Sequence, residues 1–161
     1  MSRIPALGPR GEGWVVLQFV LFVVIGATGL VLSTPDRDAW TSIGTVTGTL
    51  LLLGGIGLGI AGLAGLQSGD ALTAVPRPRE ASRLVESGAY GLVRHPIYGA
   101  LIIGAVGWSL LRGSPAALLG AAALFVVLDL KRRREEIWLM ERYPDYAAYR
   151  RRTRRFIPWI W

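Results

Sequence analysis

The residues best suited to chemistry lie in two short stretches, RHPIY at 94–98 and KRRREE at 131–136. The first contains His95, the one histidine of the chain, and the second places a pair of glutamates after four basic residues. An imidazole and a carboxylate can exchange protons, and arginine can hold a carboxylate through two parallel hydrogen bonds. The chain has no cysteine, and one histidine cannot build a histidine-based metal cluster. We therefore expect neither a thiolate nucleophile nor a metal site.

Both stretches lie at the ends of apolar segments, which determines how they meet. Proline suits the first position of a helix, so a helix should begin at Pro96 with its positive N-terminus beside Arg94 and His95. An anion such as a carboxylate is favoured at that helix end. The short turn RGSP at 112–115 should make the next apolar helix run back antiparallel. The Arg-His pair and the glutamates are then expected to face each other.

The rest of the chain consists largely of apolar segments that could cross a membrane. Hydrophobic residues make up 52% of the 161 residues and charged residues 18%, which indicates apolar blocks in lipid and charged blocks outside it. A span needs about 20 apolar residues, or fewer when the helix packs against a neighbour. We predict an all-α, polytopic integral membrane protein with one domain over residues 1–161. Its four expected transmembrane helices cover 14–33, 42–66, 96–111 and 115–131, and a helical tail covers 132–161.

The placement of basic residues predicts how these helices are oriented. Sixteen of the eighteen Lys and Arg residues lie before the first segment, between the second and third, or after the fourth. The positive-inside rule then places both termini, the 67–96 loop and the site in the cytoplasm. One lysine among seventeen arginines is typical of a GC-rich bacterial genome, so we expect a bacterial inner (plasma) membrane protein. A cleaved signal peptide is the alternative for the first segment, but its apolar run is long and further spans follow.

Two other patterns have simpler explanations than the functions they suggest. The formal net charge of +7 could indicate nucleic-acid binding, but in a membrane protein a basic tail favours anionic lipid headgroups. Gly57, Gly59 and Gly62 form a G-x-G-x-x-G pattern. A dinucleotide fingerprint needs a preceding strand and a polar βαβ unit, and this apolar segment has neither. We interpret these glycines as sites of close helix packing.

In their order along the chain, the motifs resemble the isoprenylcysteine carboxyl methyltransferases and their bacterial relatives, a superfamily that includes the phospholipid N-methyltransferases. The similar pieces are ESGAYGLVRHPIYGA, a glutamate pair some forty residues later and RYPDYAAYRRRTRRFIP. Together they cover about residues 75–158. The resemblance implies a methyltransferase that uses S-adenosylmethionine, held by the C-terminal half of the chain rather than by a Rossmann domain.

The resemblance also suggests roles for individual residues. The candidates for holding the cofactor are Leu84, Val85, Tyr90, Arg94, His95, Pro96, Tyr98 and Glu135. The candidate catalytic residues are Lys131, Arg134 and Glu136, with Arg132 as an alternative to Arg134. Relatives have an arginine where this chain has Lys131, and a glutamine found in some relatives has no match near Val75. Adjacent helical residues differ by about 100°, so only one glutamate should point into the hairpin, and the resemblance selects Glu135.

The acceptor of the methyl group is expected to be small and apolar or lipid-like. A carboxylate, a thiol and an amine all remain open. An amine must first lose a proton, which Glu136 or His95 could accept, whereas nearby arginine would suit a carboxylate. One competing function is a non-catalytic membrane protein whose basic tail binds anionic lipid or a protein partner. Another is a membrane enzyme of the same scaffold that does not methylate, such as an isomerase or reductase.

Overall fold

The computed structural model describes residues 4–33, 39–69, 71, 73, 75–78 and 82–158, and this part of the chain is helical. Its helices are α1 (Glu12–Val31), α2 (Ala39–Ser68), α3 (Ala89–Leu92), α4 (Pro96–Leu111), α5 (Pro115–Arg142) and α6 (Tyr146–Arg152). The described residues contain no strand, only an isolated bridge between Val93 and Arg154. The all-α prediction is therefore confirmed.

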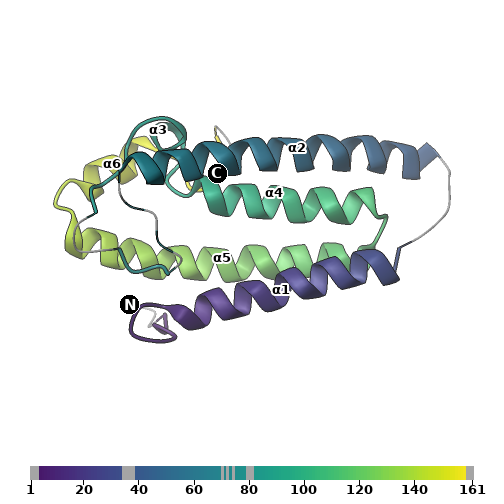
Figure 1. Cartoon of the computed structure of the whole chain (residues 1–161), viewed down its shortest axis with the longest axis horizontal. Coiled ribbons are helices and arrows are strands. Elements are labelled where there is room, and N and C mark those ends of the chain that lie inside the picture. Colours follow the sequence, from purple (N-terminus) through teal and green to yellow (C-terminus); the bar gives the residue numbers. More distant parts are fainter. Residues whose placement is uncertain are drawn as a thin grey trace.

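The four long helices lie roughly side by side in the order α2, α4, α5 and α1 (Figure 1). α2 packs against α4, α4 against α5, and α5 against α1. The short helices α3 and α6 lie at the end of this layer where α4 begins and α5 ends (Figure 1). The predicted antiparallel hairpin of α4 and α5 is present, and its turn lies at the opposite end.

The helix bounds follow local sequence signals. α4 has the predicted bounds, with a proline in its first turn, and the Ser114 side chain caps α5 by accepting a hydrogen bond from the Ala117 N–H at 3.3 Å. α5 continues without a break from its apolar half into its charged half. Pro144 then separates α5 from α6, because proline lacks an N–H and disfavours a helical residue before it. The predicted helical tail is corrected at its end, since residues 153–158 are not helical.

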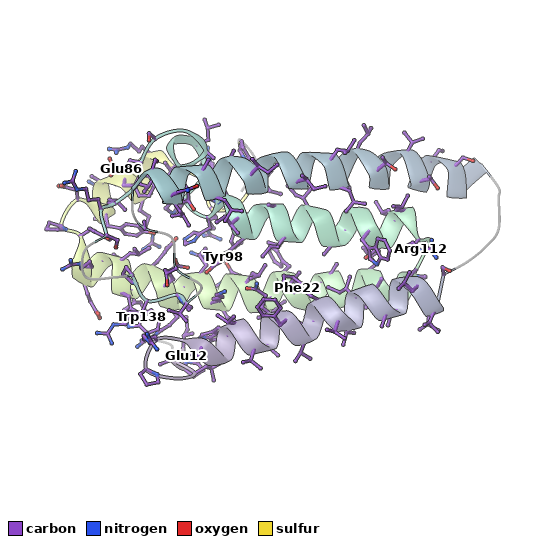
Figure 2. The ribbon with its side chains drawn as sticks, in the orientation of Figure 1. Glu12, Phe22, Glu86, Tyr98, Arg112 and Trp138 are labelled. Carbon is purple, nitrogen blue, oxygen red and sulfur yellow. The ribbon has the colours of Figure 1, made fainter. Side chains whose placement is uncertain are left out.

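Two helices are long and apolar enough to cross a membrane, α1 and residues Ser42–Ser68 of α2. Only 22% and 11% of their most apolar stretches are buried inside the protein, so they are not core helices. Side chains project outward along both helices, whereas nitrogen- and oxygen-bearing side chains gather at the end with α3 and α6 (Figure 2). Apolar surface of this extent is costly in water and favourable in a bilayer. These helices therefore suit a membrane.

Glycines bring α2 and α4 into close contact. A Cβ added at Gly55 would lie 2.9 Å from the Ala100 carbonyl oxygen, and one added at Gly62 would lie 2.8 Å from the Ile97 side chain. The packing interpretation is thus confirmed for Gly62 of the G-x-G-x-x-G pattern. Gly57 differs, because a Cβ there would meet nothing within 4 Å.

Candidate functional site

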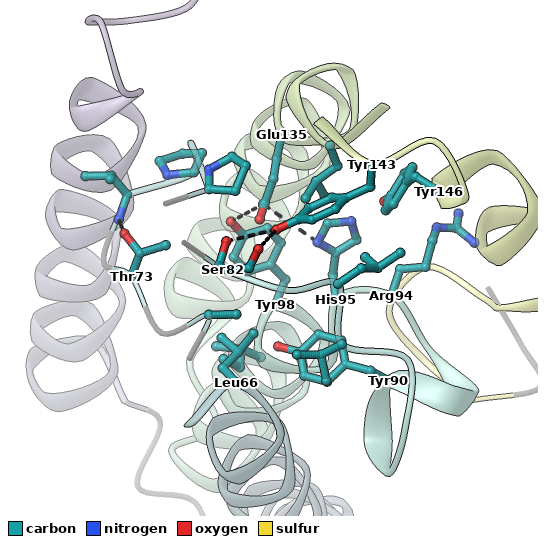
Figure 3. A pocket seen from close by; sticks show the side chains of 18 of the residues that line it. Leu66, Thr73, Ser82, Tyr90, Arg94, His95, Tyr98, Glu135, Tyr143 and Tyr146 are labelled. Carbon is teal, nitrogen blue, oxygen red and sulfur yellow. Dashed lines mark hydrogen bonds and ion pairs between the residues drawn. The ribbon is translucent and has the colours of Figure 1, made fainter. Parts of the chain in front are cut away.

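A cavity of about 240 Å³ opens at the end of the layer where α4 begins and α5 ends. Figure 3 shows side chains that line it, from the start of α4, the charged half of α5 and the segments around them. The predicted site residues among its lining are Leu84, Val85, Tyr90, Arg94, His95, Tyr98, Lys131 and Glu135. Pro96, Arg134 and Glu136 are not part of the lining. The structure thus brings most of the predicted site residues together.

A short segment near the C-terminus, residues 153–156, fixes the backbone of the Arg-His pair. We call it the C-terminal arm. The N–H of Arg94 donates to the Arg154 carbonyl at 2.8 Å, and the N–H of His95 donates to the Arg155 carbonyl at 3.0 Å. Gly99 makes this approach possible, because a Cβ there would clash with the Phe156 carbonyl. Glycine is therefore required at position 99 because the start of α4 packs against the arm.

Glu136 lies at the centre of a buried ion-pair network behind the cavity. Its side chain is 3% exposed. Arg94 Nε donates to Oε1 at 3.0 Å, and Arg132 Nη1 and Arg150 Nε lie 3.1 Å and 3.5 Å from Oε2. His95 Nε2 is 3.3 Å from Oε1. Both carboxylate oxygens are therefore occupied by protein groups.

This network keeps Glu136 ionised. Burial alone would raise the pKa of its carboxyl group, but the hydrogen bond with His95 and the charges of Arg132 and Arg94 outweigh burial and hold the pKa well below its usual value. An ionised carboxylate can only accept a hydrogen bond, so His95 Nε2 carries the proton in their contact. Glu136 is suited to orient His95 and Arg94, and its catalytic role stays a prediction.

Glu135 reaches the cavity from the neighbouring position on α5. Its Oε2 accepts a hydrogen bond from the Tyr98 hydroxyl at 2.7 Å and lies 3.7 Å from His95 Nδ1 (Figure 3). The rings of His95 and Tyr98 are stacked with their centroids 5.3 Å apart. Both glutamates thus contact the Arg-His region, and the expectation that only one would do so was wrong. The reason is that His95 lies outside regular helix, where its ring can fit between two adjacent residues of α5.

Lys131 and Gln18 form a polar pair at another wall of the cavity. Lys131 is 4% exposed, and its Nζ donates to Gln18 Oε1 at 2.8 Å. The same Nζ lies 4.9 Å from the centre of the Tyr98 ring. Gln18 comes from α1 and was not among the predicted site residues. Its signal was its polarity within an otherwise apolar span, where polar side chains are rare and usually functional.

Arg134 points elsewhere. Its guanidinium lies 4.6 Å from the Trp138 ring centroid, and its Nε is buried without a hydrogen-bond partner in the described part of the chain. The alternative, Arg132, is held between Glu136 and Asp129, whose Oδ1 is 2.7 Å from Arg132 Nη2. Neither arginine lines the cavity. Of the three basic candidates, Lys131 is the one at the cavity wall.

Three tyrosines spaced by three residues close the cavity near α6, and sequence analysis gave them no individual role. The Tyr143 hydroxyl is 2.8 Å from Ser82 Oγ and donates to the Ser82 carbonyl at 2.9 Å (Figure 3). The Tyr149 hydroxyl donates to the Tyr90 carbonyl at 2.8 Å. The Tyr146 hydroxyl is buried and has no partner among the described residues. These contacts attach α3 and residues 82–86 to the end of α5 and to α6.

The lining of the cavity indicates what kind of ligand it suits. Glu135 is the one acidic side chain among the described lining residues, and its side chain is 21% exposed. Tyr146 offers an unused hydroxyl, and Leu66 and Val85 offer apolar surface. A ligand that combines positive charge, hydrogen-bonding groups and an apolar part fits these groups. Among the described residues, no group of three or more His, Cys, Asp or Glu could hold a metal ion.

Comparisons with known proteins place this chain in a family and give two curated relatives. A model of the phospholipid methyltransferase family matches residues 43–146. The chain is 32% identical over 114 residues to the cobalt-zinc-cadmium resistance protein CzcN of Cupriavidus metallidurans, which covers 70% of this chain and 51% of CzcN. It is 32% identical over 81 residues to the nickel-cobalt-cadmium resistance protein NccN of Alcaligenes xylosoxydans xylosoxydans, which covers 50% of this chain and 38% of NccN. The chain thus spans about half or less of these curated relatives.

Proposed function

The chain belongs to the phospholipid methyltransferase family, and on that premise we propose that it is a membrane methyltransferase that uses S-adenosylmethionine. The acceptor is an apolar or lipid-like molecule that carries a carboxylate, thiol or amine. The observation that carries the proposal is the position of Glu135, the one acidic side chain among the described residues that line the cavity.

The residues of the cavity fit this cofactor. S-adenosylmethionine has a sulfonium and an ammonium, and Glu135 supplies the negative charge that they need. Tyr146 supplies an unused buried hydroxyl, and Leu84 and Val85 supply apolar contacts. The groups that would hold the cofactor are therefore Glu135, Tyr146, Tyr90, Leu84 and Val85.

When bound, S-adenosylmethionine would supply an electrophilic methyl group for a lone pair of the acceptor, and the electron pair of the carbon–sulfur bond would stay on sulfur. A carboxylate or thiolate acceptor needs little proton transfer, so the protein contributes mainly orientation and exclusion of water. An amine must lose a proton. The Nε2 proton of His95 is directed at Glu136. The other ring nitrogen, Nδ1, is therefore the one that could accept the proton of the amine.

The membrane arrangement we propose has four spans, with both termini and the cavity on the cytoplasmic side of a bacterial inner membrane. The asymmetry of Lys and Arg supports this orientation. Reporter fusions after Trp161 and within 70–80 should report a cytoplasmic location, and one within 35–39 should report a periplasmic location. A periplasmic C-terminus would contradict this topology. The exposed arginines of α6 would then face anionic headgroups on the cytoplasmic side.

Titration of the purified protein in detergent with S-adenosylmethionine tests the function. The parent should bind, and Glu135→Gln should bind about ten- to hundredfold more weakly, because a charge-assisted hydrogen bond is worth about 1.5–3 kcal/mol. Glu141→Gln is the matched control, since it removes the same charge from an exposed position of α5 outside the cavity. Absence of binding by the parent, or equal effects of the two changes, would favour a non-catalytic lipid-binding protein.

A further inference from the structure

A second hollow, of about 690 Å³, lies beside the cavity at the charged end of the helix layer, and we call it the basic hollow. Three parts of the chain line it: the turn before α1, segment 75–78 and the end of α5. Trp138 of α5 and Glu12 at the start of α1 both lie at this end of the molecule (Figure 2). Val75 and Pro78 line both the basic hollow and the cavity. A ligand in the basic hollow would therefore contact a wall of the cavity.

Positive charge dominates the basic hollow. Arg10, Arg77 and Arg142 contribute three guanidinium groups, one from each part of the lining, and Glu141 contributes the one carboxylate among the described lining residues. Arg10 also pairs with Glu12, whose Oε1 lies 3.2 Å from the Arg10 Nε. With both carboxylates counted, the guanidinium groups are still in excess. The hollow therefore attracts an anion.

Arg134 and Trp138 extend this basic surface along α5. Trp138 lines the hollow, and the guanidinium carbon of Arg134 lies 4.6 Å from the centre of the Trp138 ring. The Nε of Arg134 is buried and has no hydrogen-bond partner in the described part of the chain. A fourth guanidinium group thus lies against a lining residue. Indole rings and basic side chains are both favoured at the surface of a bilayer.

Hydrogen bonds and packing fix two walls of the basic hollow relative to each other. The N–H of Arg77 donates to the Arg10 carbonyl at 3.3 Å, and Arg77 Nη1 donates to the Pro9 carbonyl at 3.4 Å. Gly11 packs closely on Pro76, since a Cβ added at Gly11 would lie 2.9 Å from the proline ring. A ligand that bridges the guanidinium groups would link these two walls to the end of α5.

The position of the basic hollow indicates which anion it suits. Its N-terminal wall leads directly into α1, one of the two helices long and apolar enough to cross a membrane. In the proposed membrane arrangement the hollow therefore lies at the level of the cytoplasmic headgroups. Phosphate is the anion that phospholipid headgroups carry, and guanidinium groups bind it through paired hydrogen bonds. Basic pockets beside membrane helices are known to bind anionic headgroups.

We propose that the basic hollow binds the phosphate headgroup of an anionic phospholipid, and that the bound headgroup holds segment 75–78 in place as a wall of the cavity. This lipid is a bound regulator and is not the methyl acceptor. The site is also separate from the exposed arginines of α6, which are not part of its lining. Arg10 lies outside the residues that the family model matches, so the site joins the family's region to the segment before it.

The test measures equilibrium binding of radiolabelled dioctanoyl phosphatidylglycerol to the purified protein in non-ionic detergent, without S-adenosylmethionine. Dioctanoyl phosphatidylcholine has the same chains and no net charge, so the ratio of the two affinities reports recognition of the anionic headgroup. The parent should prefer phosphatidylglycerol. Arg77→Gln and Arg142→Gln should each reduce this preference about fivefold, which is the usual contribution of one basic residue. Arg151→Gln is the matched control, because Arg151 is exposed on α6 outside the hollow.

Two further measurements separate binding in the hollow from a loss of structure. Glu141→Gln removes the carboxylate from the lining and keeps its shape, so this variant should prefer phosphatidylglycerol more strongly than the parent does. The amide of Arg77, which donates to the Arg10 carbonyl, should exchange its hydrogen more slowly when the lipid is bound. At the same lipid concentration, Arg142→Gln should show less of this protection.

Three results would overturn the inference. If Arg77→Gln and Arg142→Gln keep the preference as fully as Arg151→Gln does, the attraction is spread over the basic surface. If glycerol phosphate displaces the labelled lipid as well as unlabelled lipid does, the hollow binds a soluble phosphate instead of a membrane lipid. If saturating phosphatidylglycerol leaves exchange at Arg77 unchanged, the headgroup does not hold the cavity wall. None of these results depends on methyl transfer, so the proposed function is tested separately.

Discussion

The two sides of the His95 ring differ in how their charges are paired. On the Nε2 side, Glu136 is surrounded by the guanidinium groups of Arg94, Arg132 and Arg150. On the Nδ1 side, Glu135 has a tyrosine hydroxyl and no lysine or arginine within 4.0 Å among the described residues. Adjacent residues of one helix therefore have different tasks. The paired carboxylate holds the fold together, and the other is available to a ligand.

The largest effect that would sharpen this contrast is expected from Glu136→Gln. The change leaves the buried Arg94 and Arg132 without their counter-charge, and breaking a buried pair from one side costs about 3–5 kcal/mol. The free energy of unfolding, measured in detergent with a chemical denaturant, should fall by that amount. Glu135→Gln should change it much less, because the Glu135 carboxylate has no arginine partner. Equal losses in both variants would remove the distinction between the two sides.

Gly99→Ala should have the next largest effect. The added methyl group would clash with the Phe156 carbonyl and push away the C-terminal arm. We expect a loss of about 1–3 kcal/mol in unfolding free energy, which is typical of overpacking, and faster amide hydrogen exchange at Arg94 and His95. Gly104→Ala is the control, since a Cβ there meets open space. A Gly99→Ala variant as stable as this control would show that the arm is not tightly packed.

A smaller effect is expected from Tyr143→Phe on the ligand-accessible side. The change removes the hydroxyl that contacts Ser82 and should cost about 1 kcal/mol. Faster amide hydrogen exchange across residues 82–86, with no change in α4, would show that this contact holds residues 82–86 against the cavity. A double-mutant cycle with Ser82→Ala isolates the contact between the two side chains. Fully additive losses of unfolding free energy would contradict that contact.

The smallest change in unfolding free energy within the ordinary pH range is expected from the titration of Glu136. Its pKa is lowered in the folded protein, so its stabilising contribution is fully present above the unfolded-state pKa of about 4.3 and is lost as the pH falls through the folded pKa. The parent should therefore lose unfolding free energy below about pH 4.3, and Glu136→Gln should lack this component of the loss. A parent and variant with parallel pH profiles would place the acid sensitivity elsewhere.

Much of the fold could be predicted from the sequence because it depends on local patterns. Apolar segment length, Pro96 and the 112–115 turn are enough to place α4, α5 and their antiparallel contact. The ion pairs could not be predicted in detail, since the direction of the His95 ring depends on backbone pairing with residues some sixty positions later. Gln18 could be noticed as polar, but nothing local identifies Lys131, 113 residues away, as its partner.

The C-terminal arm has a consequence for biosynthesis. Residues 153–156 are translated after every long helix, yet they fix the backbone of Arg94 and His95. Chains emerge from the ribosome N-terminus first, at about 5–20 residues per second. All four long helices can thus be made while the backbone of Arg94 and His95 still lacks its carbonyl partners in the arm. A nascent chain whose translation has not reached residue 156 should therefore lack the backbone partners that hold Arg94 and His95 in place.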